Sequence, residues 1–544
     1  MNSLRTLFVF LLILVVASFF RMHALDTTPP GLYPDEAMNG NNALEALESP
    51  PPEGGVKAFY PENNGREGLF INIQGFFLKV LVPRAGGNPE PWMLRLPSAL
   101  FGIITVAGVF FLAKELFRNE ELGITNKELG DDERRHNSKF IIHNSNAVAL
   151  LSTFLIAVSF WHINFSRIGF RAIMAPCFLV WGVYLLLLAF RKWREFPDSP
   201  PAESTPKKYK SIIRNSLFPL FAGIVYGLGM HSYIAYRATP LVIAVILFLF
   251  VLKIGWKPVL KITTWFVLGA LVVSLPLISY FAQNPEDFFG RTSDVSVFSS
   301  PSPLGELGMN IIKTVGMLFF IGDSNWRHNL SGAPELLWPV AILFLLGVIV
   351  GTRALFRKNS GSDRDIKTGA WILFAWFLTA LLPVVFSNEG IPHALRSILM
   401  IPPIFILAGL GGVTFYEWMR RKLQPVSWQW VLPVAASLLL LFVAVTAYRD
   451  YFIVWGQDRN TAGAFSEEYV TIGRKLNAVP QNIPKYVVVE AGGVLVRGIP
   501  MPTQTVMYIT NTFSEERQKE KNIRYILPQE SGSIPEGSYV TVIR

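Results

Sequence analysis

The sequence predicts a polytopic α-helical membrane protein with about eleven spanning helices, a large first external loop and a small C-terminal α/β domain. Of its 544 residues, 51% are hydrophobic and only 16% are charged, whereas about a quarter of the residues in soluble domains are charged. Apolar runs long enough to cross about 30 Å of hydrocarbon recur along the chain. The predicted spans are residues 4–22, 93–117, 145–163, 172–190, 216–230, 239–252, 262–282, 334–352, 369–386, 394–415 and 431–449.

Charged residues between the spans predict which side of the protein faces the cytoplasm. Four segments are rich in Lys and Arg, and counting spans puts them all on one side: 191–214, 253–261, 353–367 and 420–422. Cytoplasmic loops of membrane proteins carry an excess of these residues, so we expect this side to be cytoplasmic. The loop 118–142, on the same side, is nearly balanced in charge. The clustering also accounts for the net charge of +10, so no nucleic-acid partner is expected.

The sequence divides into a membrane domain, residues 1–450, and a C-terminal domain, residues 451–544. After the last span, helix-like "EEYVTIGRKLNAV" is followed by strand-like "KYVVVE", "NIRYIL" and "SYVTVI", a pattern typical of a small α/β domain. Counting spans places this domain outside the cytoplasm, and it has no evident catalytic motif. The single cysteine, Cys177, excludes an intrachain disulfide and a cysteine metal cluster.

The first external loop, residues 23–92, is unusually long for a connection between two membrane helices. The stretch "PDEAMNGNNALEAL" predicts a helix that begins at a proline and carries Ala37, Asn41, Leu44 and Leu47 on one stripe. The stretch "REGLFINIQGFFLKVLV" is apolar and amphipathic, and "SPPPEGG" separates the two. We therefore expect two short helices that lie on the outer membrane surface.

Asp35 and Glu36 stand side by side at the start of the first of these helices. Acidic side chains are favourable in the first turn of any helix, because they offset the helix dipole. A carboxylate at the membrane edge is equally suited to act as a general base that takes a proton from an attacking alcohol. The pattern alone does not decide between the two.

Several motifs occur in an order that resembles a known group of membrane enzymes. "YPDEA" follows the first span, and "REGLF" and "RLPSALFGIITVAGVFFLAKELF" come next; "NFSRIGFRAIMAP", "GLGMHSYIAYRATPL", "GDSNWRHNLSGAPELLWP" and "HALRSILMIPPIF" follow later. Together they resemble bacterial members of the protein O-mannosyltransferase and aminoarabinose transferase clan of the membrane glycosyltransferase-C superfamily. The resemblance covers nearly all of residues 1–450 and does not extend to the C-terminal domain.

The resemblance implies a bacterial inner-membrane enzyme that uses a polyprenyl-phosphate sugar as donor. It assigns the catalytic base to Asp35, with Glu36 beside it as a second catalytic candidate. In the aminoarabinose enzymes a Glu-Lys-Pro-Pro-Leu-like motif supplies a proposed metal ligand, and here Glu67 occupies that place without the Lys and the prolines. A divalent metal is the only cofactor suggested, with Glu67 and His328 as its tentative ligands.

Transfer of a sugar from a lipid phosphate also needs cations for the phosphate and an apolar slot for the lipid. Arg396 is the strongest phosphate candidate, because it precedes the apolar run "SILMIPPIF". Tyr233 and Tyr236 flank Arg237 and are able to stack on a sugar. Each of these residues also fits a purely interfacial role beside lipid headgroups. The donor-binding candidates on outward-facing turns are Arg167, Arg171, Tyr233, Tyr236, Arg237, Arg327, His393 and Arg396.

The sequence thus predicts a glycosyltransferase, inverting at the sugar, that works at the outer face of the membrane on a hydroxyl acceptor. The acceptor class is open: a protein, a glycolipid or a polysaccharide. Two other functions are weighed against it, a transporter or flippase for lipid-linked sugars and a non-catalytic membrane assembly protein. Few charges lie in the middle of the predicted spans, which argues against transport. An assembly role leaves the acidic first loop unexplained.

Overall fold

The computed structural model describes residues 3–48, 55–62, 65–118, 145–195, 206–288, 297–299, 301–356, 363–388, 390–423 and 430–544. Most of the predicted loop 118–142, the break "SPPPEGG" and parts of the basic loops 191–214 and 353–367 lie outside these residues. Among the described residues, nine helices are long and apolar enough to cross a membrane. Two further predicted spans correspond to shorter apolar helices, at 145–157 and 216–231. The predicted polytopic helical fold class is confirmed.

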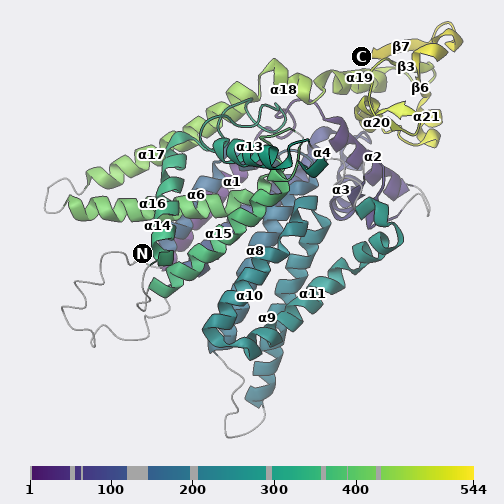
Figure 1. Ribbon diagram of the computed structural model, residues 1–544. Helices are drawn as coiled ribbons and strands as arrows, with labels where there is room; N and C mark the ends of the chain where they lie inside the picture. Colours follow the sequence, from purple (N-terminus) through teal and green to yellow (C-terminus); the bar gives the residue numbers. More distant parts are fainter. Residues whose placement is uncertain are drawn as a thin grey trace, which may run out of the picture.

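The membrane helices form two neighbouring groups (Figure 1). Helices α8, α9, α10 and α11 pack side by side, and α6, α14 and α16 form the other group. Helix α4 contacts both groups, and α1 packs against α4 and α6. Their bounds are α1 Ser3–Met22, α4 Pro91–Leu116, α6 Ser145–Ala157, α8 Met174–Glu195, α9 Pro206–Leu228, α10 Pro240–Ile254, α11 Trp256–Gln283, α14 Trp338–Phe356, α15 Asp363–Val385, α16 Ile401–Lys422 and α17 Val431–Tyr448.

Short elements gather at one end of these helices, the end predicted to face outward. They join the membrane helices to one another and carry most of the polar residues discussed below. They are α2 Pro34–Glu48, β1 Phe59–Tyr60, β2 Arg66–Glu67, α3 Leu69–Leu81, α7 Phe160–Phe165, α13 Pro303–Gly316, and the short 3-10 turns η1 Pro83–Ala85, η2 Arg171–Ile173, η3 Gly229–His231, η4 Ile234–Ala238, η5 Val297–Ser299 and η6 Ile398–Met400.

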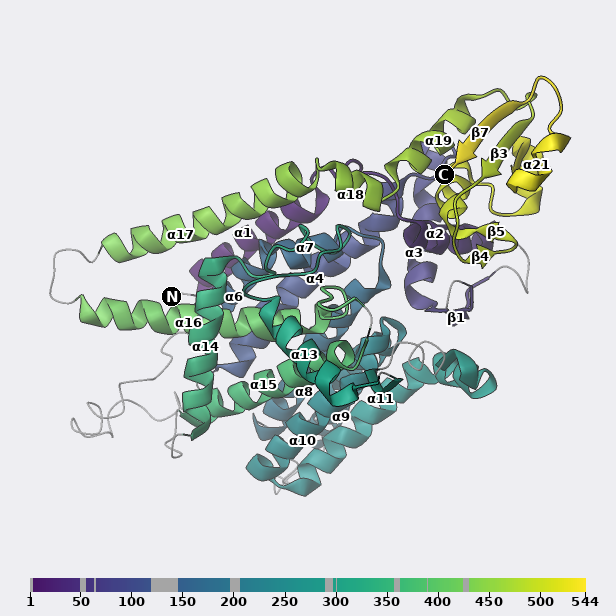
Figure 2. The ribbon, with the colours of Figure 1, turned by 45° about the horizontal axis from the view of Figure 1, so that its top comes forward.

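Helix α2 is enclosed on several sides, which differs from the predicted surface helix. It packs against α3 and α4 on the membrane side and against α20 on the C-terminal side. Buried residues run without a break from Glu36 to Leu44, while Leu47, placed on the predicted apolar stripe, is 41% exposed. The stripe was therefore incomplete, because the sequence of α2 alone does not show that the C-terminal domain covers its second face (Figure 2).

The C-terminal residues form a small α/β unit, as predicted. A π-helical turn, η7 Arg449–Trp455, extends α17. The three predicted strands form one parallel sheet in the order β6-β3-β7, with Tyr486 of β3 opposite Arg524 and Val540. The remaining elements are α18 Arg459–Ala464, α19 Glu467–Ala478, β3 Lys485–Val489, β4 Leu495–Val496, β5 Ile499–Pro500, η8 Met501–Thr503, α20 Gln504–Thr510, α21 Glu515–Lys521, β6 Ile523–Ile526, η9 Pro528–Ser533 and β7 Tyr539–Ile543.

The C-terminal unit holds α2 by packing and by ion pairs. Met38 lies in the same buried apolar cluster as Val487 and Ile523 of the sheet. Arg497 forms an ion pair with Glu45 at 2.7 Å, and Arg517 with Glu48 at 2.8 Å. These pairs are partly exposed and contribute little each, so the packing of apolar side chains is the main attachment.

Replacing Gly40 by Ala is expected to weaken this attachment. The added Cβ would lie 2.5 Å from a ring carbon of Tyr508, and Tyr508 is fully buried, so overpacking should cost about 1–3 kcal/mol. We expect a lower midpoint of thermal unfolding for the purified protein in nanodiscs. Gly463→Ala is the control, because nothing lies within 4 Å of its added Cβ. Equal midpoints for the two variants would contradict the packing described.

Candidate active site

A cavity of about 650 Å³ lies at the end of the membrane helices where the short elements gather. Five segments far apart in the sequence supply most of its lining: residues 33–39, 66, 170–172, 323–328 and 390–396; Tyr233 completes it. Turns that the sequence analysis placed on the outer side thus meet around one space.

Arginines dominate the charge of the cavity. Arg66, Arg171, Arg327 and Arg396 line it together with two acids, Asp35 and Asp323. Arg327 lies over the ring of Tyr33, 4.0 Å from its centroid, and the side chain of Arg396 contacts the hydroxyl of Ser387. Guanidinium groups bind phosphate through two oxygens at once, so this lining is suited to a phosphate-bearing ligand.

Asp35 faces the cavity from the first turn of α2. Its side chain is 37% exposed, and one carboxylate oxygen lies 3.4 Å from Nη2 of Arg66. The backbone supports this placement, since the N–H groups of Glu36 and Ala37 both donate to the carbonyl oxygen of Tyr33 at the helix start. A carboxylate so placed is within reach of a molecule bound in the cavity.

Glu36, its neighbour in sequence, points the other way and does not line the cavity. Successive residues of a helix are turned by about 100°, and here the turn carries Glu36 into the protein interior. Its Oε2 accepts the N–H of Gly169 at 2.7 Å and lies 3.2 Å from Nε of Arg95. Both side chains of this ion pair are fully buried. Glu36 therefore holds the start of α2 in position, and we no longer consider it a residue that contacts the substrate.

Arg95 extends the same network to the turn that precedes α2. Its Nη1 donates to the carbonyl of Pro29 at 2.6 Å and its Nη2 to that of Gly31 at 2.7 Å. The Glu36–Arg95 pair thus fixes both the chain that enters α2 and the first turn itself. This arrangement sets the direction in which Asp35 leaves the helix.

The donor-binding candidates separate into two groups in the structure. One group lines the cavity: Tyr233, His393 and three of the predicted arginines, Arg171, Arg327 and Arg396. Arg167 does not; it is buried and donates to the carbonyls of Phe20, Ala24 and Thr28.

Tyr236 and Arg237 also lie away from the cavity lining. Tyr236 is fully buried and donates its hydroxyl hydrogen to the carbonyl of Tyr226 at 2.9 Å. Arg237 lies over the ring of Phe288, 4.3 Å from its centroid, and 3.5 Å from Oε1 of Glu67.

Glu67 is not placed with His328, the residue predicted to share a metal with it. It is buried between two arginines, with Oε2 2.8 Å from Nε of Arg171 and Oε1 3.5 Å from Arg237. Glu67 therefore orients Arg171 at the cavity wall. His328 is instead grouped with Asp323 and His393, and Glu67 is not part of that group.

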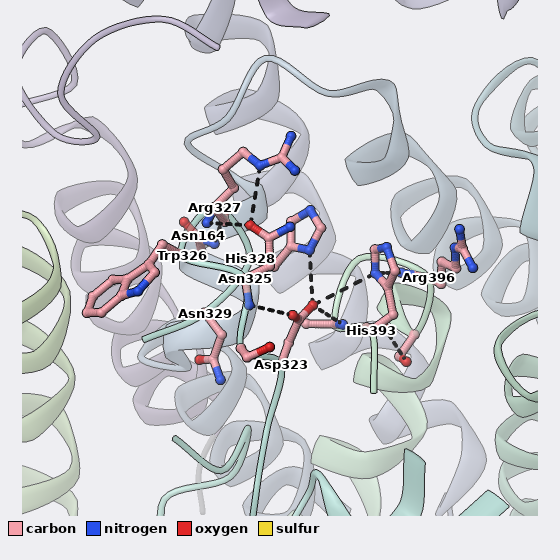
Figure 3. A network of polar contacts seen from close by, with 12 residues as sticks. Asn164, Asp323, Asn325, Trp326, Arg327, His328, Asn329, His393 and Arg396 are labelled. Atoms are coloured by element: carbon pink, nitrogen blue, oxygen red, sulfur yellow. Dashed lines mark hydrogen bonds and ion pairs between the residues drawn. The ribbon is translucent and has the colours of Figure 1, made fainter. Parts of the chain in front are cut away.

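Asp323 is the centre of a polar network in the cavity wall (Figure 3). Nδ1 of His328 donates to its Oδ2 at 3.0 Å, and the backbone N–H groups of Asn325 and Ala394 donate to its carboxylate at 2.8 and 2.9 Å. Burial raises the pKa of Asp323, but the hydrogen bonds from His328, Asn325 and Ala394 lower it by more, so the net pKa is below the ordinary value. Asp323 is therefore ionised at neutral pH.

The two histidines beside Asp323 are held in the neutral form. Burial is the largest cause that lowers the pKa of His328. Burial, with the neighbouring His328 and Arg396, lowers the pKa of His393 to about 3. The rings stack with centroids 4.7 Å apart.

Two charged residues of the cavity lining were missed as site candidates by sequence reasoning, Arg66 and Asp323. Arg66 is part of the stretch "REGLF", from which only Glu67 was considered, and Asp323 was noted without a role. The signal was present in "GDSNWRHN", where an acid, an arginine and a histidine stand within six residues. What the sequence does not show is that residues 390–396 complete the group.

Comparison with known proteins identifies the fold. No protein-family model and no curated protein sequence matches the chain. Archaeal oligosaccharyltransferase AglB from Archaeoglobus fulgidus matches with a TM-score of 0.52 and 12% identity, over 97% of this chain and 70% of that chain. ArnT from Cupriavidus metallidurans matches with a TM-score of 0.52 and 14% identity, over 98% of this chain and 91% of that chain. Both belong to the glycosyltransferase-C superfamily, so the fold implied by the sequence resemblance is confirmed.

Removing the charge of Glu36 is expected to destabilise the protein strongly. Glu36→Gln keeps the shape of the side chain but leaves the buried Arg95 without a counter-charge, which should cost about 3–5 kcal/mol. The measurement is the midpoint of thermal unfolding in nanodiscs. Glu468→Gln is the matched control, since Glu468 is an exposed acid in the first turn of α19. If Glu36→Gln unfolds no earlier than the control, the pair does not fix this region.

Proposed function

We propose that this protein is a glycosyltransferase that moves a sugar from a polyprenyl-phosphate-linked donor to a hydroxyl acceptor at the extracytoplasmic face of the membrane. The observation that carries the proposal is one cavity whose lining includes Asp35 and four arginines, Arg66, Arg171, Arg327 and Arg396. The AglB structure that shares the fold contains a dolichol-phosphate and an inhibitory peptide, which supports a polyprenyl-phosphate ligand here.

The proposed reaction assigns Asp35 the role of general base. The acceptor hydroxyl attacks the anomeric carbon of the sugar as Asp35 takes the hydroxyl proton, and the bond from that carbon to the phosphate oxygen breaks. Attack opposite the leaving phosphate inverts the anomeric configuration and needs one base only. The lipid phosphate leaves as an anion that Arg327 and Arg396 stabilise.

We propose that, while the donor is bound, its lipid chain extends from the cavity along the surface of α13. This amphipathic helix exposes Leu304 and Ile312 to 81% and 67%, side chains that suit contact with isoprenoid units. On its other face, Asn310 donates to the carbonyls of Val385 and Ser387. These bonds hold the helix next to the segment 390–396, which lines the cavity.

Asp35→Asn is expected to abolish transfer without unfolding the protein. Loss of the base should lower the rate roughly 100- to 10,000-fold. The measurement is transfer of labelled sugar from a panel of polyprenyl-phosphate sugars to a mixed acceptor extract, with purified protein in nanodiscs. Asp26→Asn is the matched control, since Asp26 is exposed and does not line the cavity. If the wild type consumes no donor, the proposed function is wrong; if Asp35→Asn is as active as the control, the base lies elsewhere.

Arg396→Gln is expected to raise the KM for the donor by a larger factor than it lowers kcat. A charge-assisted hydrogen bond contributes about 1.5–3 kcal/mol, so the KM for the donor should rise roughly 10- to 100-fold. Arg449→Gln is the control, because Arg449 is 66% exposed and paired with Asp450 away from the cavity. An unchanged KM in Arg396→Gln would remove Arg396 from the phosphate site.

A further inference from the structure

Asp323, His328 and His393 form a cluster on the cavity wall that the proposed transfer does not use. Asp323 and His328 come from the loop before α14, and His393 from the segment between α15 and η6. One ligating atom from each lies within 4.8 Å of the others. Metal–ligand bonds of about 2.0–2.2 Å hold neighbouring ligand atoms roughly 3–3.5 Å apart. A small contraction would therefore bring one atom of each residue to one ion, provided that the hydrogen bond between Nδ1 of His328 and Asp323 opens and its proton is released to solvent.

The protein holds this cluster in place from outside. The backbone N–H groups of Asn325 and Ala394 fix the carboxylate of Asp323. The indole N–H of Trp161 donates to the carbonyl of Ala394 at 3.0 Å and so anchors the residue next to His393. Bonds of this kind to the groups around a metal ligand orient the ligand before the metal binds.

The contact between His393 and Asp323 points to a cation. Nδ1 of His393 lies 3.8 Å from Oδ2 of Asp323, too far for a hydrogen bond. The same Nδ1 accepts a long hydrogen bond, 3.4 Å, from the backbone N–H of Arg396, which makes it a nitrogen with a lone pair. Two acceptor atoms therefore face each other, and a positive ion between them would turn this repulsion into attraction.

We propose that Asp323, His328 and His393 bind one divalent transition-metal ion. Two imidazole nitrogens and one carboxylate oxygen are a donor set that suits Zn²⁺, Co²⁺ or Fe²⁺, whereas Mg²⁺ prefers oxygen ligands alone. All three residues line the cavity, so an ion held by them would be accessible from it. There the ion would take an oxygen of the donor phosphate beside Arg396; this last statement rests on the proposed function, whereas metal binding by the cluster does not.

Metal binding is tested directly on the full-length protein in nanodiscs, after treatment with a chelator and without donor or acceptor. Calorimetric titration with Zn²⁺ is expected to show one equivalent bound per chain, and Mg²⁺ is expected to bind far more weakly. Co²⁺ should give the visible absorption of an ion with nitrogen and oxygen ligands. Asp323→Asn and His393→Gln should each weaken Zn²⁺ binding by at least about 100-fold.

The matched controls are Asp26→Asn and His23→Gln, both at exposed positions, and they should bind Zn²⁺ as the wild type does. The Co²⁺ spectrum of the wild type keeps the inference testable if a cluster variant does not fold. Absence of stoichiometric Zn²⁺ binding, or equal binding in cluster and control variants, would overturn the inference. If sugar transfer continues after treatment with the chelator, the statement that the ion binds the donor phosphate is wrong, while the proposed function stands. If Zn²⁺ binds as expected but no sugar is transferred, the proposed function is wrong, while the metal site stands.

Discussion

The buried ion pair between Glu36 and Arg95 is the constraint on which the arrangement of the cavity depends. Both side chains are fully enclosed, so each charge is stable there only while the other is present. Through Arg95 the pair also binds the carbonyls of Pro29 and Gly31. The entry to α2 is thereby fixed, and the preceding residue, Asp35, is left to face the cavity.

The same constraint explains why two adjacent acids have different environments. Glu36 accepts the N–H of Gly169, which stands two residues before Arg171 of the cavity wall. A Cβ at position 169 would approach Glu36 Oε2 to 3.1 Å, so glycine permits this close contact. The pair therefore joins the wall segment 170–172 to α2, while the C-terminal unit covers α2 from the other side. Fold stability and site geometry depend on one group of residues.

Sequence reasoning identified what depends on local pattern and composition. The membrane spans, the two helices of the first loop and the three C-terminal strands follow from apolar periodicity. Asp35 was singled out by the family resemblance, because its place at a helix start does not distinguish a base from a residue that offsets the helix dipole. The role of Glu36 could not be read, because its partners are 59 and 133 residues away. Arg167 was predicted to be a phosphate ligand. The sequence does not distinguish such a ligand from a buried arginine that donates hydrogen bonds to backbone carbonyls, which is what Arg167 does. The Asp323 cluster needed the meeting of two loops, which only the fold provides.

We propose above that one cavity receives the phosphate of a lipid donor between Asp35 and the arginines. The most direct measurement is a cryo-electron microscopy structure of the protein in nanodiscs with a bound polyprenyl phosphate. We expect phosphate density within hydrogen-bond distance of Arg327 or Arg396, with Asp35 across the same cavity. Phosphate density at the opposite end of the membrane helices, against Arg191, Arg194 and Lys253, which line a second, smaller pocket, with the Asp35 cavity empty, would contradict it.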